Sequence, residues 1–96
     1  MPKQEAPALR SCPVCGDGLL RLYRCGRCDA VVAMCDECEL IWSDAAKVVR
    51  RGKTKSNAAF PACPACEAKR VKWFRLSLEE IREAGLESLL PSPPSD

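Results

Sequence analysis

Residues 12–38 read CPVCGDGLLRLYRCGRCDAVVAMCDEC, and this stretch contains three pairs of cysteines with the spacing C-x-x-C. A fourth pair follows after a gap of 24 residues, and the chain has eight cysteines and no histidine. Two thiolates at this spacing can bend around one metal ion, and two such pairs complete the four-sulfur site that structural zinc prefers. The sequence therefore predicts two zinc ions per chain. The predicted ligands are Cys12, Cys15, Cys25, Cys28, Cys35, Cys38, Cys63 and Cys66.

The spacing leaves open which pairs share an ion. In a sequential arrangement, the first two pairs hold one zinc ion as a short zinc ribbon, and the last two pairs hold the other. In a cross-brace, as in RING, PHD and FYVE domains, the first and third pairs share one ion, and the second and fourth share the other. The gap of six residues between the second and third pairs suits a cross-brace, because a short strand can return the third pair beside the first. Both arrangements remain open at this point.

A chain of 96 residues allows a single small domain whose apolar core is thin, so we expect metal to be required for folding. The predicted fold class is a small, metal-stabilised α+β domain with its zinc sites on β-hairpin knuckles, a short central helix and a C-terminal helix. The expected parts are a flexible lead (1–11), a double zinc-binding domain (12–76), a C-terminal helix packed on it (77–90) and a disordered tail (91–96).

The secondary structure is predicted from local patterns. Alternating residues predict strands over 19–24 and 70–76, and the apolar run over 30–34 predicts a return strand after the first of them. A Ser-Asp N-cap and a following glycine bound a predicted helix over 45–51. A capping box, Ser77-Leu78-Glu79-Glu80, predicts the start of the last helix.

The cysteines also bear on the compartment. Residues 1–7 contain no apolar segment of the kind that marks a chain for export, so a disulfide framework is disfavoured. The longest apolar run near the middle, residues 30–35, is far shorter than the roughly 20 residues that span a bilayer. We therefore expect an intracellular protein with no membrane contact, cytoplasmic or, in a eukaryote, nuclear.

The charged residues are unevenly distributed. Residues 47–75 contain nine basic residues and one acidic residue, whereas acidic residues predominate on both sides. Such a segment could bind the phosphates of RNA or DNA, with Trp73 or Phe74 stacking on bases, and affinity would then fall steeply with salt. The candidate nucleic-acid contacts are Lys47, Arg50, Arg51, Lys53, Lys55, Lys69, Arg70, Lys72 and Arg75.

Over residues 12–75, the four C-x-x-C pairs resemble all-cysteine zinc-ribbon and treble-clef proteins, and their 9, 6 and 24 spacing is similar in outline to FYVE-type double-zinc modules. The basic, histidine-rich motif of FYVE domains is represented only by Arg21-Leu22-Tyr23-Arg24-Cys25, without histidine. The acidic tip dipeptide of the elongation-factor ribbons is absent from residues 39–62. The resemblance therefore implies zinc and a fold class without a specific family.

Three functional interpretations follow. The leading one is a non-enzymatic interaction module that binds another protein, with Trp42 and Trp73 as candidate partner anchors. The alternatives are a nucleic-acid-binding zinc finger and, with less support, a RING-like ubiquitin ligase module. An enzyme is not expected, because closed four-sulfur sites are structural and the chain has no histidine to act as a base.

Overall fold

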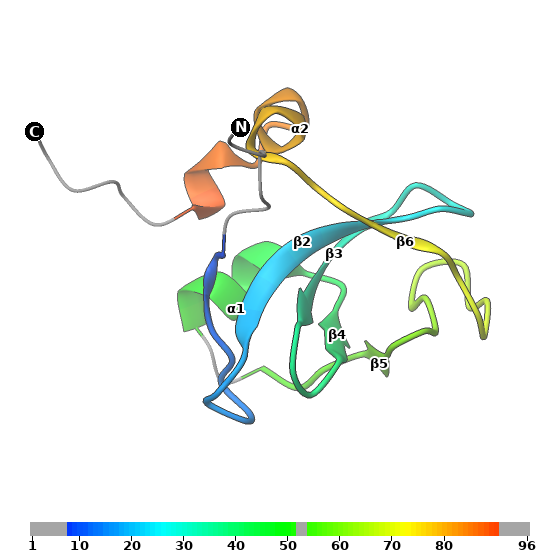
Figure 1. Ribbon diagram of the computed structural model, residues 1–96, viewed down its shortest axis with the longest axis horizontal. Helices are drawn as coiled ribbons and strands as arrows, with labels where there is room; N and C mark the ends of the chain where they lie inside the picture. Colours follow the sequence, from blue (N-terminus) through cyan, green and yellow to red (C-terminus); the bar gives the residue numbers. More distant parts are fainter. Residues whose placement is uncertain (1–7, 52–53, 91–96) are drawn as a thin grey trace, which may run out of the picture.

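The computed structural model describes residues 8–51 and 54–90 as a six-stranded antiparallel sheet with helices at one end (Figure 1). This α+β architecture agrees with the predicted class. The strands are β1 (Arg10–Ser11), β2 (Leu19–Cys25), β3 (Val31–Cys35), β4 (Leu40–Trp42), β5 (Ala58–Ala59) and β6 (Trp73–Arg75). The helices are α1 (Ala45–Arg51), α2 (Leu78–Glu83) and the 3-10 turn η1 (Glu87–Leu89).

Strand β2 is the centre of the sheet. It pairs with β3 along one edge, from Leu20 opposite Cys35 to Arg24 opposite Val31. Its other edge is shared, since β1 pairs with the start of β2 and β6 pairs with its end. The remaining order, β3-β4-β5, continues the sheet away from β2.

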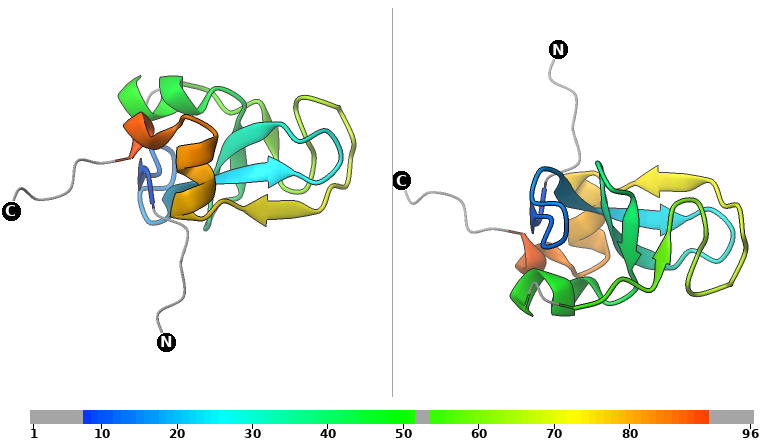
Figure 2. Two further views of the ribbon diagram at one scale, coloured as in Figure 1. Left: turned by 90° about the horizontal axis from the view of Figure 1, so that it is seen from above. Right: turned by 90° about the horizontal axis from the view of Figure 1, so that it is seen from below.

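The two faces of the sheet bury different clusters. Because side chains alternate along a strand, Leu22 of β2 and Trp42 of β4 lie on the face that packs against Val48 of α1 and Ile81 of α2. Ile41, the neighbour of Trp42 in β4, lies on the other face in a second cluster with Tyr23, Val32 and Met34. Figure 2 shows α1, α2 and η1 gathered at one end of the molecule, while the turn between β2 and β3 lies at the other.

Both helices begin at the expected caps. The Asp44 carboxylate accepts a hydrogen bond from the Lys47 backbone N–H at 3.1 Å. At α2 the Ser77 hydroxyl accepts from the Glu80 N–H, and the Glu80 carboxylate accepts from the Ser77 N–H, so the predicted capping box is present. Gly85 follows α2 with a φ of +74°, a conformation that glycine adopts without steric cost.

The N-terminal lead differs from the expectation. Leu9 is 4% exposed within the core, and Arg10–Ser11 forms β1, so the part of the lead from residue 8 to 11 is packed and paired. An apolar residue that can be buried beside β2 outweighs the local pattern of prolines and charges. The lead's residues 1–7, the predicted tail 91–96 and residues 52–53 lie outside the described residues. Within the described part of the chain, no helix has the length and apolarity needed to cross a membrane.

Candidate metal centres

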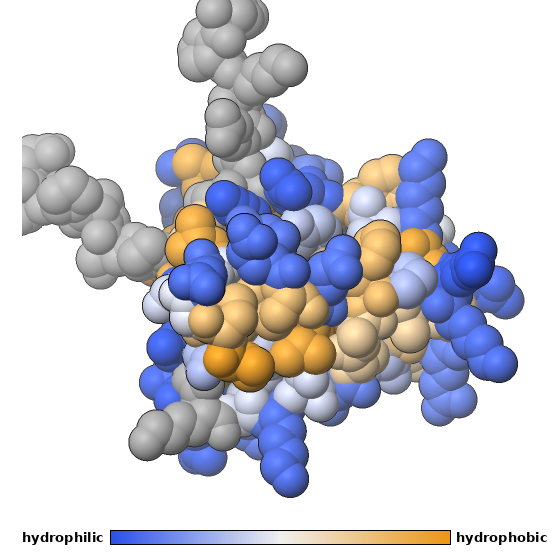
Figure 3. Space-filling view, turned by 60° about the horizontal axis from the view of Figure 1, so that its bottom comes forward, coloured by the Kyte–Doolittle hydropathy of each residue, from blue (hydrophilic) through white to orange (hydrophobic). Residues whose placement is uncertain are grey.

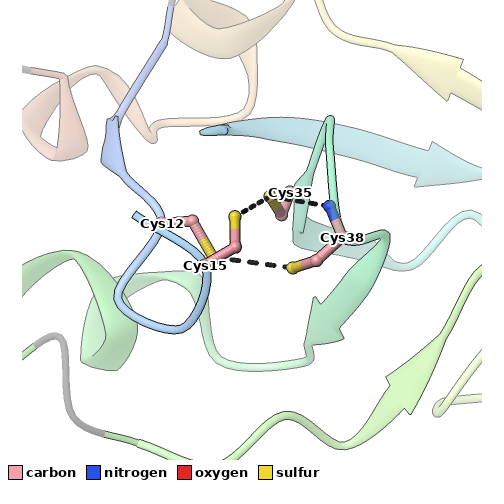
Figure 4. A group of neighbouring side chains, drawn as sticks. All are labelled: Cys12, Cys15, Cys35 and Cys38. Carbon is pink, nitrogen blue, oxygen red and sulfur yellow. Dashed lines mark hydrogen bonds between the residues drawn. The ribbon is translucent and has the colours of Figure 1, made fainter. Parts of the chain in front are cut away.

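The eight cysteines lie in two groups of four, and each group could hold a metal ion. In each group the four sulfur atoms all lie within 4.8 Å of one another. The first and third pairs share a group, as do the second and fourth, so the grouping is that of the cross-brace and the sequential alternative is wrong. Site 1 consists of Cys12, Cys15, Cys35 and Cys38 (Figure 4), and site 2 consists of Cys25, Cys28, Cys63 and Cys66.

Site 1 is assembled by the turns at one end of β2 and β3. Its first pair lies in the turn between β1 and β2, which is closed by the Cys12 N–H donating to the Gly18 carbonyl at 2.9 Å. Its second pair follows β3, and the β2–β3 register places Cys35 opposite Leu20. As a result, Sγ of Cys12 lies 3.7 Å from Sγ of Cys38, and Sγ of Cys15 lies 3.6 Å from Sγ of Cys35.

Site 2 lies at the opposite end of the same two strands. Its first pair occupies the turn between β2 and β3, and its second pair lies in the segment between β5 and β6. The pairing of β6 with β2 brings the two cysteine pairs together. This pairing continues past Cys25 in a hydrogen bond from the Gly26 N–H to the Lys72 carbonyl at 2.8 Å. Sγ of Cys25 lies 3.9 Å from Sγ of Cys66, and Sγ of Cys28 lies 3.7 Å from Sγ of Cys63.

The donor set fits zinc. A tetrahedron with Zn–S bonds of about 2.3 Å has sulfur–sulfur edges of about 3.8 Å. Two edges in each group, given above, are 3.6–3.9 Å long, and the remaining edges do not exceed 4.8 Å. Four sulfur ligands and no nitrogen or oxygen ligand are typical of structural zinc. The cysteines therefore have the chemistry and the spacing of two structural zinc sites.

Backbone N–H groups turn toward the sulfurs, more of them in site 1 than in site 2. In site 1, four N–H donors lie 3.3–3.4 Å from a sulfur atom: Val14 to Cys12, Gly18 to Cys15, and Glu37 and Cys38 to Cys35. In site 2, two such donors occur among the described residues, from Arg27 and Cys28 to Cys25. Hydrogen bonds to a thiolate stabilise its negative charge, so the metal-binding thiolates of site 1 are stabilised by more hydrogen bonds than those of site 2.

Burial also distinguishes the sites. Cys12 and Cys35 belong to the main core cluster, and Cys15 and Cys38 pack against it. In site 2, Cys28 is exposed. Gly18 shows how tightly site 1 is enclosed, because a Cβ at this position would lie 2.5 Å from Sγ of Cys35. All four ligands of site 1 therefore belong to the core or pack against it, whereas site 2 has Cys25 and Cys63 buried but one ligand, Cys28, exposed.

The thiol pKa values follow from these contacts. The Gly18 N–H is the largest influence on Cys15 and lowers its pKa to about 7. For Cys25 burial raises the pKa, but the N–H groups of Cys28 and Arg27 outweigh it, and the pKa falls to about 7. Burial and the neighbouring thiols raise the pKa of Cys38 to about 12. The thiols of Cys15 and Cys25 thus ionise near neutral pH, whereas Cys38 releases its proton only as metal binds.

The candidate nucleic-acid contacts do not form one surface. One group lies on or after α1, and the other lies between site 2 and the end of β6, and Figures 1 and 2 show α1 and the segment between β5 and β6 at opposite ends of the molecule. The α1 group is Lys47, Arg50, Arg51 and Lys55; the β6 group is Lys69, Arg70, Lys72 and Arg75; all are exposed. Lys53 lies outside the described residues.

The two tryptophans have different environments. Trp42 is 1% exposed in the core and its Nε1 donates to the Thr54 carbonyl at 2.8 Å, so it offers no surface to a partner. The prediction that Trp42 anchors a partner is therefore wrong. Side chains alternate along a strand, and this alternation turns Trp42 toward α1 and into the core. Trp73 is half-buried, donates to the Pro61 carbonyl at 3.2 Å, and lines an open groove of about 400 Å³.

Two exposed aromatic residues adjoin Trp73. Phe60 is 46% exposed and forms part of the groove, and Phe74 is 39% exposed. The Arg24 guanidinium lies 4.9 Å and the Lys72 Nζ 5.7 Å from the centre of the Phe74 ring. Phe74 was predicted only as a base-stacking residue, and no local pattern marked Phe60 as a surface residue. The exposure of Phe74 depends on β6 lying at the margin of the sheet, which no local pattern indicates.

Apolar and polar surface are segregated on at least one face of the molecule. Figure 3 shows a band of hydrophobic residues there, bordered by strongly hydrophilic ones.

Comparison with known proteins found no relative: no family model, curated protein or solved structure matches this chain.

Proposed function

We propose that the chain is a non-enzymatic interaction module in which two zinc ions, bound in a cross-brace, hold a small sheet in place for a protein partner. The observation that carries this proposal is the alternation of the cysteine pairs between two four-sulfur groups. Each group joins segments that are distant in sequence, so two ions can fix the whole sheet. For a core this small, zinc sites worth about 10–16 kcal/mol each in finger peptides supply much of the folding free energy.

The absence of catalysis is part of the proposal. Four thiolates complete the coordination of a tetrahedral ion and leave no position for a substrate or an activated water molecule. The sequence has no histidine to move a proton near neutral pH. The thiolates also need a reducing environment, which is the basis for proposing an intracellular location.

The proposed partner surface is the groove beside Trp73. Tyr23 and Met34, both largely buried, also line it together with the exposed Phe60. A half-buried tryptophan and an exposed phenylalanine beside charged residues resemble the composition of protein interfaces, in which aromatic residues are enriched. Trp42 also lines a groove, but it is 1% exposed there, so Trp73 is the tryptophan with surface available to a partner.

Native mass spectrometry combined with circular dichroism tests the proposal. Two zinc ions per chain are expected, and their removal by a chelator should unfold the sheet reversibly. A chain that keeps its spectrum without metal, or that binds a single ion, would contradict the two-zinc module. A Trp73→Ala variant should retain both ions, because the side chain contacts neither group of sulfurs within hydrogen-bonding distance.

Nucleic-acid binding is the second candidate, supported by Phe74 between two cationic side chains. An exposed ring among cations can stack on a base while the cations contact phosphates. Fluorescence anisotropy with single-stranded oligonucleotides would show affinity falling steeply between 50 and about 200 mM salt. Charge reversal in the β6 group should abolish this binding, and charge reversal in the α1 group should have little effect. Failure to bind at low salt would reject this candidate.

A further inference from the structure

Strand β6 has one edge that pairs with no other strand among the described residues. The Leu76 N–H donates to the Leu22 carbonyl, and the Gly26 N–H donates to the Lys72 carbonyl. In an antiparallel pair, hydrogen-bonded positions alternate with positions whose polar groups point away from the partner. The register of Phe74 with Arg24 therefore directs the N–H and C=O groups of Trp73 and Arg75 away from β2.

This edge is open to approach. In both views of Figure 2, β6 lies along the margin of the molecule, with β2 on its inner side and no other described element beyond it. The opposite margin of the sheet, at β5, is formed by a strand of only two residues. At the start of the edge the Val71 N–H already donates to the Pro61 carbonyl at 3.2 Å, so the backbone groups of Trp73 and Arg75 are the template for one more strand.

The charged side chains around this edge determine the charge of the peptide strand that can bind there. Arg75 is exposed on β6, and Lys69, Arg70 and Lys72 are exposed just before it. Arg24, on the neighbouring strand, forms an ion pair with Asp29 at 2.9 Å, and Glu67 is the one acidic residue in the 47–75 segment. The groove beside this edge is also lined by Asp36, which forms an ion pair with Arg21, and by Glu39. The four cations before and on β6 still outnumber Glu39 and Glu67, the two carboxylates here that lie outside the ion pairs of the described residues, so a negatively charged strand is favoured.

We propose that an extended acidic peptide of a partner protein binds as an added antiparallel or parallel strand along β6, with hydrogen bonds to the backbone of Trp73 and Arg75. This inference rests on the proposed function and specifies its partner. On one face the side chains of the peptide meet Phe74 and Lys72. On the other face they reach the groove lined by Trp73. The backbone supplies affinity, and the cations supply specificity.

The same cations argue against a second copy of this chain at the edge. Two β6 strands side by side would bring Lys72 and Arg75 of each copy together, and like charges on neighbouring strands are unfavourable. Charged edge strands commonly prevent self-association in this way. An acidic partner removes the repulsion, so a single feature both prevents dimerisation and admits the peptide.

A pair of variants at Arg75 tests the backbone contact. Arg75→Gln removes the charge and the contacts of the guanidinium with Tyr23, a hydrogen bond at 3.2 Å and a stacking contact at 5.6 Å, but keeps the outward N–H. Arg75→Pro removes the same charge and contacts together with the N–H, so the difference between the two variants reports the backbone contact. Proline is tolerated on an edge strand where its missing N–H faces solvent, so pairing with β2 should persist. Phe74→Pro is the matched disruptive control, because the Phe74 N–H faces β2. Native mass spectrometry on each sample establishes whether two zinc ions are bound.

The probe is a synthetic ten-residue peptide of alternating glutamate and valine, titrated into zinc-loaded full-length protein. Tryptophan fluorescence follows binding, and ¹⁵N-labelled protein shows which backbone amides are protected. We expect protection at Trp73 and Arg75, weakened binding in Arg75→Gln, and binding at least about fivefold weaker again in Arg75→Pro, because an added strand loses a hydrogen bond. A peptide with lysine in place of glutamate should bind at least about fivefold more weakly.

Each other outcome overturns the inference. If two zinc ions are bound and the acidic peptide leaves the Trp73 and Arg75 amides unprotected, the edge does not accept a strand, although the zinc module stands. If Arg75→Pro and Arg75→Gln bind the peptide equally, binding is electrostatic only. If a 20-nucleotide oligo-dT displaces the peptide, binds more tightly and depends on Phe74, the surface belongs to nucleic acid. A chain without zinc contradicts the proposed function itself.

Discussion

The two metal sites should release zinc in sequence, site 2 first. Site 1 has four backbone N–H groups within 3.4 Å of its sulfurs and lies in the core, whereas site 2 has two such donors and the exposed Cys28. If each additional hydrogen bond contributes about 0.5–1.5 kcal/mol, two of them favour site 1 by roughly 1–3 kcal/mol. This corresponds to a difference in zinc affinity of roughly 5- to 150-fold.

Stepwise competition with a chromophoric chelator measures this difference. Native mass spectrometry of the partly stripped protein should show a one-zinc species over a range of chelator concentrations. Alkylation with iodoacetamide followed by peptide mapping then identifies the empty site. We expect modification of Cys25, Cys28, Cys63 and Cys66, with the other four cysteines protected.

Two results would refute this reasoning. Loss of both ions in one step would mean that the sites are bound cooperatively and that the local hydrogen bonds do not decide their order. Alkylation of Cys12 and Cys35 before Cys28 would mean that burial in the core does not protect bound zinc. A Cys28→Ser variant provides the matched control, because it should reduce the zinc content to one ion without unfolding the core around site 1.

Four further outcomes follow from the structure. Trp42→Ala should cost about 3–5 kcal/mol of unfolding free energy in chemical denaturation, because a fully buried indole is lost. Ser77→Ala should cost about 1 kcal/mol in the same assay, because it removes the α2 cap. Gly18→Ala should weaken zinc binding at site 1 in chelator competition, because its Cβ would crowd Sγ of Cys35. The zinc affinity should rise with pH, because thiols such as Cys38, with a pKa of about 12, lose protons to metal at neutral pH.

Matched variants serve as controls for the two stability predictions, and the pH prediction has a refuting outcome of its own. Phe74→Ala, at an exposed aromatic residue, should be far less destabilising than Trp42→Ala, and equal losses would contradict the assignment of the core. A Thr at position 77 should retain most of the cap. The metal-free protein binds more protons than the zinc-bound protein, so acidification favours the metal-free protein. Zinc retention that does not change with pH would therefore exclude thiolate ligation.

Local patterns predicted much of the fold. The strand from Leu19 and the helix starting after Ser77 are specified by neighbouring residues, through alternation and capping, and they appear where expected. The C-x-x-C spacing identifies the cysteines as ligands because both sulfurs of a pair lie in one turn. These features depend on interactions within a few residues of the chain.

Non-local features were not predictable in the same way. The cysteine grouping depends on which strands pair, and the gaps between pairs were compatible with two groupings. The pairing of β6 with β2 joins segments about 50 residues apart, and it decides that Phe74 is exposed. The basic segment is continuous in sequence, but the fold sends its two halves to opposite ends of the molecule. Burial of Trp42 depends on the phase of a three-residue strand.

The alternation of the cysteine pairs also orders events during synthesis of the chain. All four ligands of site 1 precede residue 39, whereas site 2 waits for Cys66. At roughly 5–20 residues per second, a ribosome needs roughly 1–6 seconds to add the intervening 28 residues. The nascent chain can therefore close site 1 while Cys25 and Cys28 are still without their partners. A shortage of zinc in the cell would then leave a half-built molecule with its first site complete and its β6 edge not yet positioned.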